Sequence, residues 1–174
     1  MQQIKVWDPL VRLFHWSLVA AFAANALFVD DESLLHQWIG YTVVGLVVVR
    51  LVWGLVGSPY ARFASFPPSI KGAVGQLRDV ATGRRHIHLG HTPLGALMIY
   101  NLLATLLLVG LSGFLMTTDM FWGTEWTGEL HEAAVTWAEI SVVLHIAAVV
   151  FESVRTRVNL PRAMVTGVKQ IPPA

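Results

Sequence analysis

Four histidines stand in or beside the apolar segments of this 174-residue chain: His15, His36, His131 and His145. Ionisable side chains within a membrane span are costly, so they are candidates for function. A neutral imidazole is a ligand for a metal ion, and two imidazoles on opposite faces of a macrocycle hold haem iron. The first hypothesis is therefore a haem or metal protein, and the competing interpretation of any single histidine is a hydrogen bond to a neighbouring helix.

The positions of the four histidines predict two depths in a membrane. His36 and His131 each stand at the start of an apolar segment, near one surface. At about 1.5 Å per helical residue, His15 and His145 are expected roughly 20 Å deeper. His131 and His145 are fourteen residues apart, which brings them within about 40° of each other on one helix. We expect His15 to pair with His145 around one haem, and His36 with His131 around a second haem.

A transition-metal site is the other interpretation that uses these ligands. A tetrahedral zinc centre needs four ligands close together, and two levels separated by about 20 Å do not supply them. The chain contains no cysteine, which excludes disulfides, thiolate metal sites, iron-sulfur clusters and covalent haem attachment through a C-x-x-C-H sequence. Two non-covalently bound b-type haems are therefore preferred, and a haem-free transition-metal-binding membrane protein is kept as an alternative.

The composition is that of a membrane protein, because 55% of the residues are hydrophobic and 13% are charged, whereas a soluble domain carries about 25% charge. Apolar runs of about 20 residues or more predict spans at about 10–29, 36–57, 93–116 and 133–154. The polar His15 argues that the first run is a retained span and not a cleaved signal peptide. We expect an all-α, integral membrane four-helix bundle with two haem sites in its core, formed by residues 1–174 as a single domain.

A fifth, shorter helix is predicted in the link between the second and third spans, at about 69–82. Ser69 is a suitable N-cap, and apolar residues recur after it at helical spacing. Lys71 and Arg78 are available for lipid headgroups. We expect this helix to lie on the cytoplasmic surface of the membrane.

The charged residues predict an orientation. All twelve Lys and Arg residues lie on one side, at or before the start of the first span, around the second link or after the fourth span, so both termini are expected in the cytoplasm. Seven of the eleven acids lie on the opposite side, namely Asp30, Asp31, Glu32, Asp119, Glu125, Glu129 and Glu132. Such an anionic face would attract a cationic periplasmic partner, although it also follows from keeping cations inside.

Two further side chains are candidate cofactor contacts. Arg50 is fourteen residues after His36, so it lies near the same helix face at the depth of the inner haem, where a guanidinium can pair with a propionate. The alternative for Arg50 is an anchor whose charged end reaches the membrane surface. His91, at the start of the third span, is a candidate for binding a propionate or for exchanging protons with a quinone.

Short motifs follow one another along nearly the whole chain. They are VWDPLVRLFHW at 6–16, LHQWIGY at 35–41, RLVWG at 50–54, LGHTPLG at 89–95, LHE at 130–132, LH at 144–145 and NLPRAM at 159–164. In this order and spacing they resemble bacterial b561-type cytochromes, especially the group related to the cytochrome b subunit of nickel-iron hydrogenase.

The resemblance implies a di-haem four-helix bundle in the bacterial inner membrane, with His15, His36, His131 and His145 as axial ligands. Such a multi-pass cytochrome transfers electrons between the quinone pool and a partner, here a periplasmic cytochrome or dehydrogenase subunit, as the electron-transfer subunit of a quinone-linked oxidoreductase. Larger hydrogenase-type cytochromes carry segments that this chain lacks, so a hydrogenase partner is not implied.

Related bundles that act directly on small molecules supply a second alternative. This is a stand-alone, quinone-coupled oxidoreductase acting on a small substrate such as superoxide, although the outer links carry no cationic residue to attract such an anion. Besides the lipid bilayer and quinone, a homo-oligomer is compatible with the sequence, and no nucleic-acid partner is expected.

Overall fold

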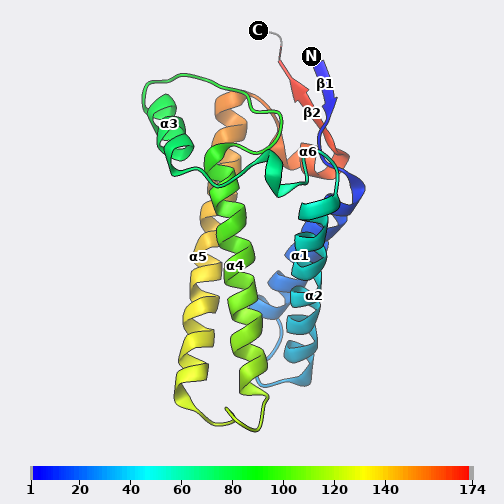
Figure 1. The fold of residues 1–174 in the computed structure, drawn as a ribbon, viewed down its shortest axis with the longest axis vertical. Coiled ribbons are helices and arrows are strands. Elements are labelled where there is room, and N and C mark those ends of the chain that lie inside the picture. Colours follow the sequence, from blue (N-terminus) through cyan, green and yellow to red (C-terminus); the bar gives the residue numbers. More distant parts are fainter. Residues whose placement is uncertain (1, 173–174) are drawn as a thin grey trace. The chain divides into compact units, whose positions relative to one another are not determined.

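A computed structural model describes residues 2–172, which are helical over most of their length. Figure 1 labels the elements along the chain. In order, they are β1 (Gln2–Lys5), α1 (Pro9–Leu27), α2 (Leu34–Val56), the 3-10 helix η1 (Phe63–Ser65), α3 (Ile70–Ala81), α4 (Pro93–Met116), α5 (Glu125–Thr156), α6 (Leu160–Thr166) and β2 (Val168–Ile171).

The helices α1, α2, α4 and α5 are long and apolar enough to cross a membrane. At most 22% of the residues in the apolar window of any of these helices are buried within the protein. Their remaining apolar side chains need a non-aqueous surrounding, and an α-helix satisfies its own backbone groups there. The predicted all-α membrane fold with four long apolar helices is thereby confirmed.

The helix boundaries differ most from the prediction at α5, which begins at Glu125 and not at Ala133. The prediction followed hydrophobicity, which stops at the acidic residues before Ala133. Thr124 precedes the helix and its hydroxyl lies 2.9 Å from that of Thr127, while Glu125 places a negative charge in the first turn, where the helix dipole favours it. Polar residues therefore start this helix well before its apolar part.

The short helix predicted at about 69–82 is present as α3. Ser69 is its N-cap, and the Ser69 hydroxyl accepts a hydrogen bond of 3.0 Å from the backbone nitrogen of Gly72. The helix ends at Ala81 and is followed by Gly83, whose φ of 71° lies in the left-handed region that glycine adopts readily. Its position on a membrane surface stays a prediction.

The chain divides into two compact units, to each of which the four long helices contribute one section. The terminal unit comprises the described residues up to 12, together with 52–100 and those from 143 onward. The central unit comprises residues 13–51 and 101–142. The prediction of a single domain stays a prediction.

In the terminal unit the two ends of the chain pair as an antiparallel ribbon of β1 and β2, with Ile4 opposite Lys169 (Figure 1). Val6 and Trp7 after β1 pack with Ala163 of α6 in a small buried cluster. Gly167 separates α6 from β2 with a φ of 83°, and its carbonyl oxygen accepts hydrogen bonds from the backbone nitrogens of Val6 and Trp7. These bonds fix both chain ends to one another.

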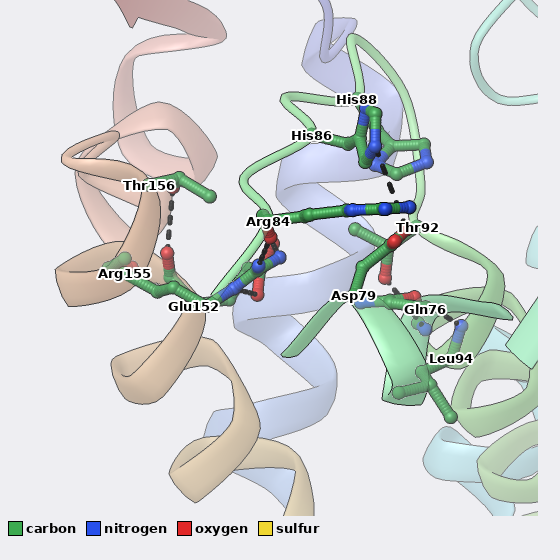
Figure 2. A network of polar contacts seen from close by, with 12 residues as sticks. Gln76, Asp79, Arg84, His86, His88, Thr92, Leu94, Glu152, Arg155 and Thr156 are labelled. Carbon is green, nitrogen blue, oxygen red and sulfur yellow. Dashed lines mark hydrogen bonds and ion pairs between the residues drawn. The ribbon is translucent and has the colours of Figure 1, made fainter. Parts of the chain in front are cut away.

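A polar network in the same unit surrounds the link between α3 and α4 (Figure 2). Arg155 forms an ion pair of 2.9 Å with Glu152 and donates a hydrogen bond to the backbone oxygen of Arg84. On α3, Asp79 lies 3.7 Å from the imidazole of His86. The network ties the basic link to α3 and to the last turns of α5.

Candidate functional site

The imidazole rings of His36 and His131 lie side by side in the central unit. Their centroids are 6.3 Å apart and their planes are inclined at 71°. A metal-imidazole bond is about 2 Å long, so two imidazoles that bind one metal ion from opposite sides have centroids about 6 Å apart. The observed spacing of this pair therefore fits an iron atom between the rings, as the sequence predicts for the outer haem.

The His131 ring is oriented by α4. Its Nδ1 lies 3.0 Å from the backbone oxygen of Val109 and 3.1 Å from the hydroxyl of Ser112. A carbonyl oxygen can only accept, so Nδ1 carries the proton and Nε2 keeps its lone pair. Histidines that bind metals commonly donate their second N–H to a backbone carbonyl in this way. The arrangement prepares Nε2 of His131 for a metal ion.

Two glycines of α4 make room for this arrangement. A Cβ at Gly113 would lie 3.1 Å from Cε1 of His131, and a Cβ at Gly110 would overlap Cγ2 of Val44. Any side chain at these positions would displace the imidazole or the valine of α2. Small residues between membrane helices permit such close approach; here Gly113 makes room for the candidate ligand His131, and Gly110 makes room for Val44 of α2.

The backbone of His36, in the first turn of α2, is held by two hydrogen bonds. The hydroxyl of Ser33 accepts a hydrogen bond of 3.1 Å from the His36 backbone nitrogen, and the side-chain amide of Asn25 donates one of 3.3 Å to its backbone oxygen. The ring Nδ1 is buried and has no hydrogen-bond partner within residues 2–172. A buried nitrogen of this kind is costly unless it binds a further group.

The second predicted pair is distributed over both units. His15 is partly buried on α1 in the central unit, with its ring edge-on to Trp16 at 5.1 Å between centroids. His145 is partly buried on α5 in the terminal unit. The pairing of His15 with His145 stays a prediction.

Arg50 is buried on α2 in the central unit, with 4% of its surface exposed. An anchor that reaches a membrane surface would expose its charged end. Burial therefore favours an internal role for this guanidinium, in which its charge is balanced inside the protein.

His91 lies immediately before the N-cap region of α4 and packs between two aromatic rings of the terminal unit. Its ring centroid is 4.1 Å from that of Phe66 and 4.7 Å from that of Trp7. Both aromatic side chains are buried. The imidazole is therefore held in one place by its neighbours and is partly exposed.

Several residues around these histidines were not predicted from the sequence. Val109, Ser112 and Gly113 contact His131, whereas only the two histidines of the pair were predicted from the sequence. The signal for Ser112 and Gly113 is their small size within an otherwise large and apolar run, which identifies an interface but not the ligand it supports. Among residues 2–172, no three His, Asp or Glu side chains gather closely enough to hold a metal ion.

Comparison with protein families gives a match over almost the entire chain. The family model described as prokaryotic cytochrome b561 matches residues 6–167. No curated protein and no solved structure matches the chain. The matched segment includes all four candidate ligands and both additional candidates, Arg50 and His91.

Proposed function

We propose, from the premise that this chain belongs to the prokaryotic cytochrome b561 family, that it holds two b-type haems and passes electrons between a periplasmic redox partner and quinone. Membership of this family makes the protein a membrane cytochrome that binds haem b and transfers electrons. The number of haems, their ligands, the quinone and the partner are the proposal. The observation that carries it is the 6.3 Å spacing of the His36 and His131 rings.

Haem b, when bound, supplies reversible one-electron chemistry, while the protein supplies its ligands, position and surroundings. His36 and His131 would hold the outer haem, with Val109 and Ser112 keeping the proton on Nδ1 of His131. His15 and His145 would hold the inner haem. All four ligands are neutral nitrogen donors, which suits iron of a bis-histidine b-type site.

Arg50 and His91 would act on the charged and protonated groups of the cofactors. The buried guanidinium of Arg50 would pair with a propionate of the inner haem, because a buried positive charge is stabilised by a hydrogen-bonded carboxylate. His91 would bind a propionate or take up and release a proton at a quinone, since an imidazole titrates near neutral pH.

The proposed route follows the charge distribution of the chain. The cationic ends and second link would face the cytoplasm in a bacterial inner membrane. The seven acids of the opposite side are all exposed, so they would attract a periplasmic cytochrome or dehydrogenase subunit with a basic surface. Electrons would pass between that partner, the outer haem, the inner haem and quinone. A fusion reporter at each terminus would test the orientation in the membrane.

The test is the haem content of the purified full-length chain and its dithionite-reduced minus oxidised spectrum. We expect two haem b per chain in the wild type and one in His36→Ala, His131→Ala or the double variant of this pair. His131→Ala combined with His145→Ala is expected to retain none. The exposed His86 is not part of either pair, so His86→Ala is the matched control and should keep both haems.

The result that would overturn the ligand assignment is a b-type spectrum that survives replacement of both His131 and His145. Loss of both haems in the double variant of His36 and His131, with a folded protein, would overturn the pairing.

Electron transfer is tested by adding a short-chain quinol anaerobically and following haem reduction. Absence of reduction by quinol, in wild-type protein that contains both haems, would contradict the quinone part of the proposal.

A further inference from the structure

Lys169 of β2 is almost completely buried, with 4% of its surface exposed. Lysine is seldom buried, because its charge must then be compensated by nearby groups. The ammonium donates hydrogen bonds of 3.0 Å to the backbone oxygen of His88 and 2.9 Å to that of Gly90. One side chain from the C-terminal strand therefore holds the backbone on both sides of Leu89.

The residue that follows this turn is His91, and Trp7 joins it to the lysine a second time. The Lys169 ammonium lies 5.4 Å from the centre of the Trp7 ring, a distance at which the π electrons attract a cation. The same indole lies 4.7 Å from the imidazole of His91. Lys169 thus acts on His91 through the backbone of the turn and through a shared aromatic neighbour.

The chain after His91 is fixed independently of Lys169. The hydroxyl of Thr92 accepts a hydrogen bond of 3.0 Å from the Gly95 backbone nitrogen, and Gln76 of α3 accepts one of 3.0 Å from that of Leu94 (Figure 2). Both bonds satisfy free N–H groups at the start of α4. Removing the lysine would therefore release the turn before His91 and leave the start of α4 capped.

Holding the turn of residues 88–90 with the buried charge of Lys169 costs free energy. Burial lowers the pKa of Lys169 from its ordinary value of 10.5 to about 8, although the negative charge of Glu152 opposes this shift. Glu152 itself is paired with Arg155 at 2.9 Å, so its negative charge is shared between Arg155 and Lys169. A methionine would fill similar space without this cost, which indicates that the N–H donors of Lys169 matter.

We propose that Lys169 is a positioning residue for His91: it holds the turn of residues 88–90 against β2 and Trp7, and thereby fixes the direction of the imidazole. The consequence for propionate binding or proton exchange rests on the proposed function, in which His91 binds a propionate or exchanges protons with quinone. The link between Lys169 and His91 itself does not depend on haem.

The test measures how fast diethyl pyrocarbonate modifies His91, relative to the exposed His86, by mass spectrometry of the full-length protein in detergent. In Lys169→Met the ratio should rise several-fold, because the turn no longer holds the imidazole between its aromatic neighbours. Lys169→Arg keeps a cation and N–H donors and should restore most of the protection. Lys5→Met is the matched control, because Lys5 lies in the same ribbon but is exposed, and it should leave the ratio unchanged.

An unchanged ratio in folded Lys169→Met, or an equal rise in Lys5→Met, would overturn the inference. If Lys169→Met does not fold, Lys169→Ala takes its place in the same assay. It is then compared with Lys169→Gln, which retains N–H donors without charge. A second measurement follows the pH profile of haem reduction by quinol, which should change in Lys169→Met and return in Lys169→Arg. The labelling requires no haem, so a failure of the proposed function leaves the labelling result to decide the role of Lys169.

Discussion

A Cβ on Gly113 of α4 would lie 3.1 Å from Cε1 of the His131 imidazole on α5. The ring is thus seated against a bare backbone position, while its Nδ1 is 3.0 Å from the backbone oxygen of Val109 one turn earlier. The position of this candidate ligand depends on a missing side chain as much as on a hydrogen bond.

Gly113→Ala is expected to displace the His131 ring by a few tenths of an ångström, because such a contact is tighter than ordinary van der Waals packing. If His131 is an axial ligand, the variant should alter the electron paramagnetic resonance spectrum of the outer haem and lower its occupancy. The inner haem should be unaffected. Haem content and low-temperature spectra of the purified variant provide the measurement.

Gly128→Ala is the control for this substitution, since a Cβ there meets nothing within 4 Å. It lies on α5 three residues before His131, and alanine favours a helix by about 1 kcal/mol over glycine. Its spectra should match those of the wild type. Wild-type spectra in Gly113→Ala as well would show that the position of the His131 imidazole does not depend on the missing side chain at Gly113.

Ser112→Ala tests the hydrogen bond at the other side of the same ring. The Ser112 hydroxyl is fully buried and lies 3.1 Å from Nδ1 of His131. Its loss removes electron density from the imidazole and should raise the midpoint potential of the outer haem, because ferric iron is then less stabilised. The rise is at most about 40 mV, the equivalent of one hydrogen bond of about 1 kcal/mol. A spectroelectrochemical titration measures it.

Ser141→Ala supplies the comparison for the serine prediction. Ser141 is also buried in the central unit, but its hydroxyl accepts from the side-chain amide of Asn101 at 2.9 Å and has no contact with His131. Its outer-haem potential should therefore equal that of the wild type. A lowered potential in Ser112→Ala would show that the hydroxyl donates its hydrogen bond to Nδ1. Nδ1 would then carry no proton, which contradicts the assignment of the proton to Nδ1 and of the metal to Nε2.

The long helices and the proximity of His36 and His131 could be predicted because they rest on regular spacing. The 3.6-residue period and the length of apolar runs determine where spans can form, and the start of α4 at Pro93 agrees with the prediction. His36 and His131 were predicted to pair from their equal depth, and their rings are adjacent. Depth along a helix follows from residue number alone.

The contacts that support the site could not be predicted in the same way. The hydrogen bond from His131 to Val109 depends on how α4 and α5 are rotated about their axes. The residue types of α4 alone do not determine that rotation. Lys169 contacts His88 and Gly90 across about 80 residues of sequence because the chain ends pair as a ribbon. A short strand in a membrane protein leaves little periodic signal.

Asp8 is predicted to stabilise the start of α1. Its carboxylate accepts hydrogen bonds from the Val11 backbone nitrogen at 2.9 Å, the Trp53 indole at 3.1 Å and the Ser58 hydroxyl. Asp8→Ala should lower the free energy of unfolding by about 1–3 kcal/mol, because an N-cap and two further bonds are lost. Thermal or denaturant unfolding in detergent measures this, and the exposed Asp31 provides the control Asp31→Ala.

The stabilisation from Asp8 should also depend on pH. Burial raises the pKa of Asp8, but the hydrogen bonds from Ser58, Val11, Trp53 and Leu10 outweigh it and hold the pKa below the ordinary 3.8. The folded state therefore binds the proton less readily than the unfolded state, so the stabilisation is complete above pH 3.8 and is lost as the pH falls below it. A stability difference between wild type and Asp8→Asn that grows at lower pH would contradict this sign.

Lys169 should make the free energy of unfolding depend on pH at the alkaline end of the range. Its pKa is about 8 in the folded protein, against an ordinary value of 10.5, so below pH 8 both states carry the proton and the cost of burial is complete. Between these two values the folded state releases its proton while the unfolded state keeps it, so the free energy of unfolding rises with pH, by up to about 3 kcal/mol. Unfolding in detergent at several pH values between 7 and about 10.5 measures this rise, and Lys5→Met should show the same rise as the wild type. Lys169→Met has no proton to release and should lack it, so identical pH profiles for Lys169→Met and the wild type would show that this lysine does not titrate as a buried group.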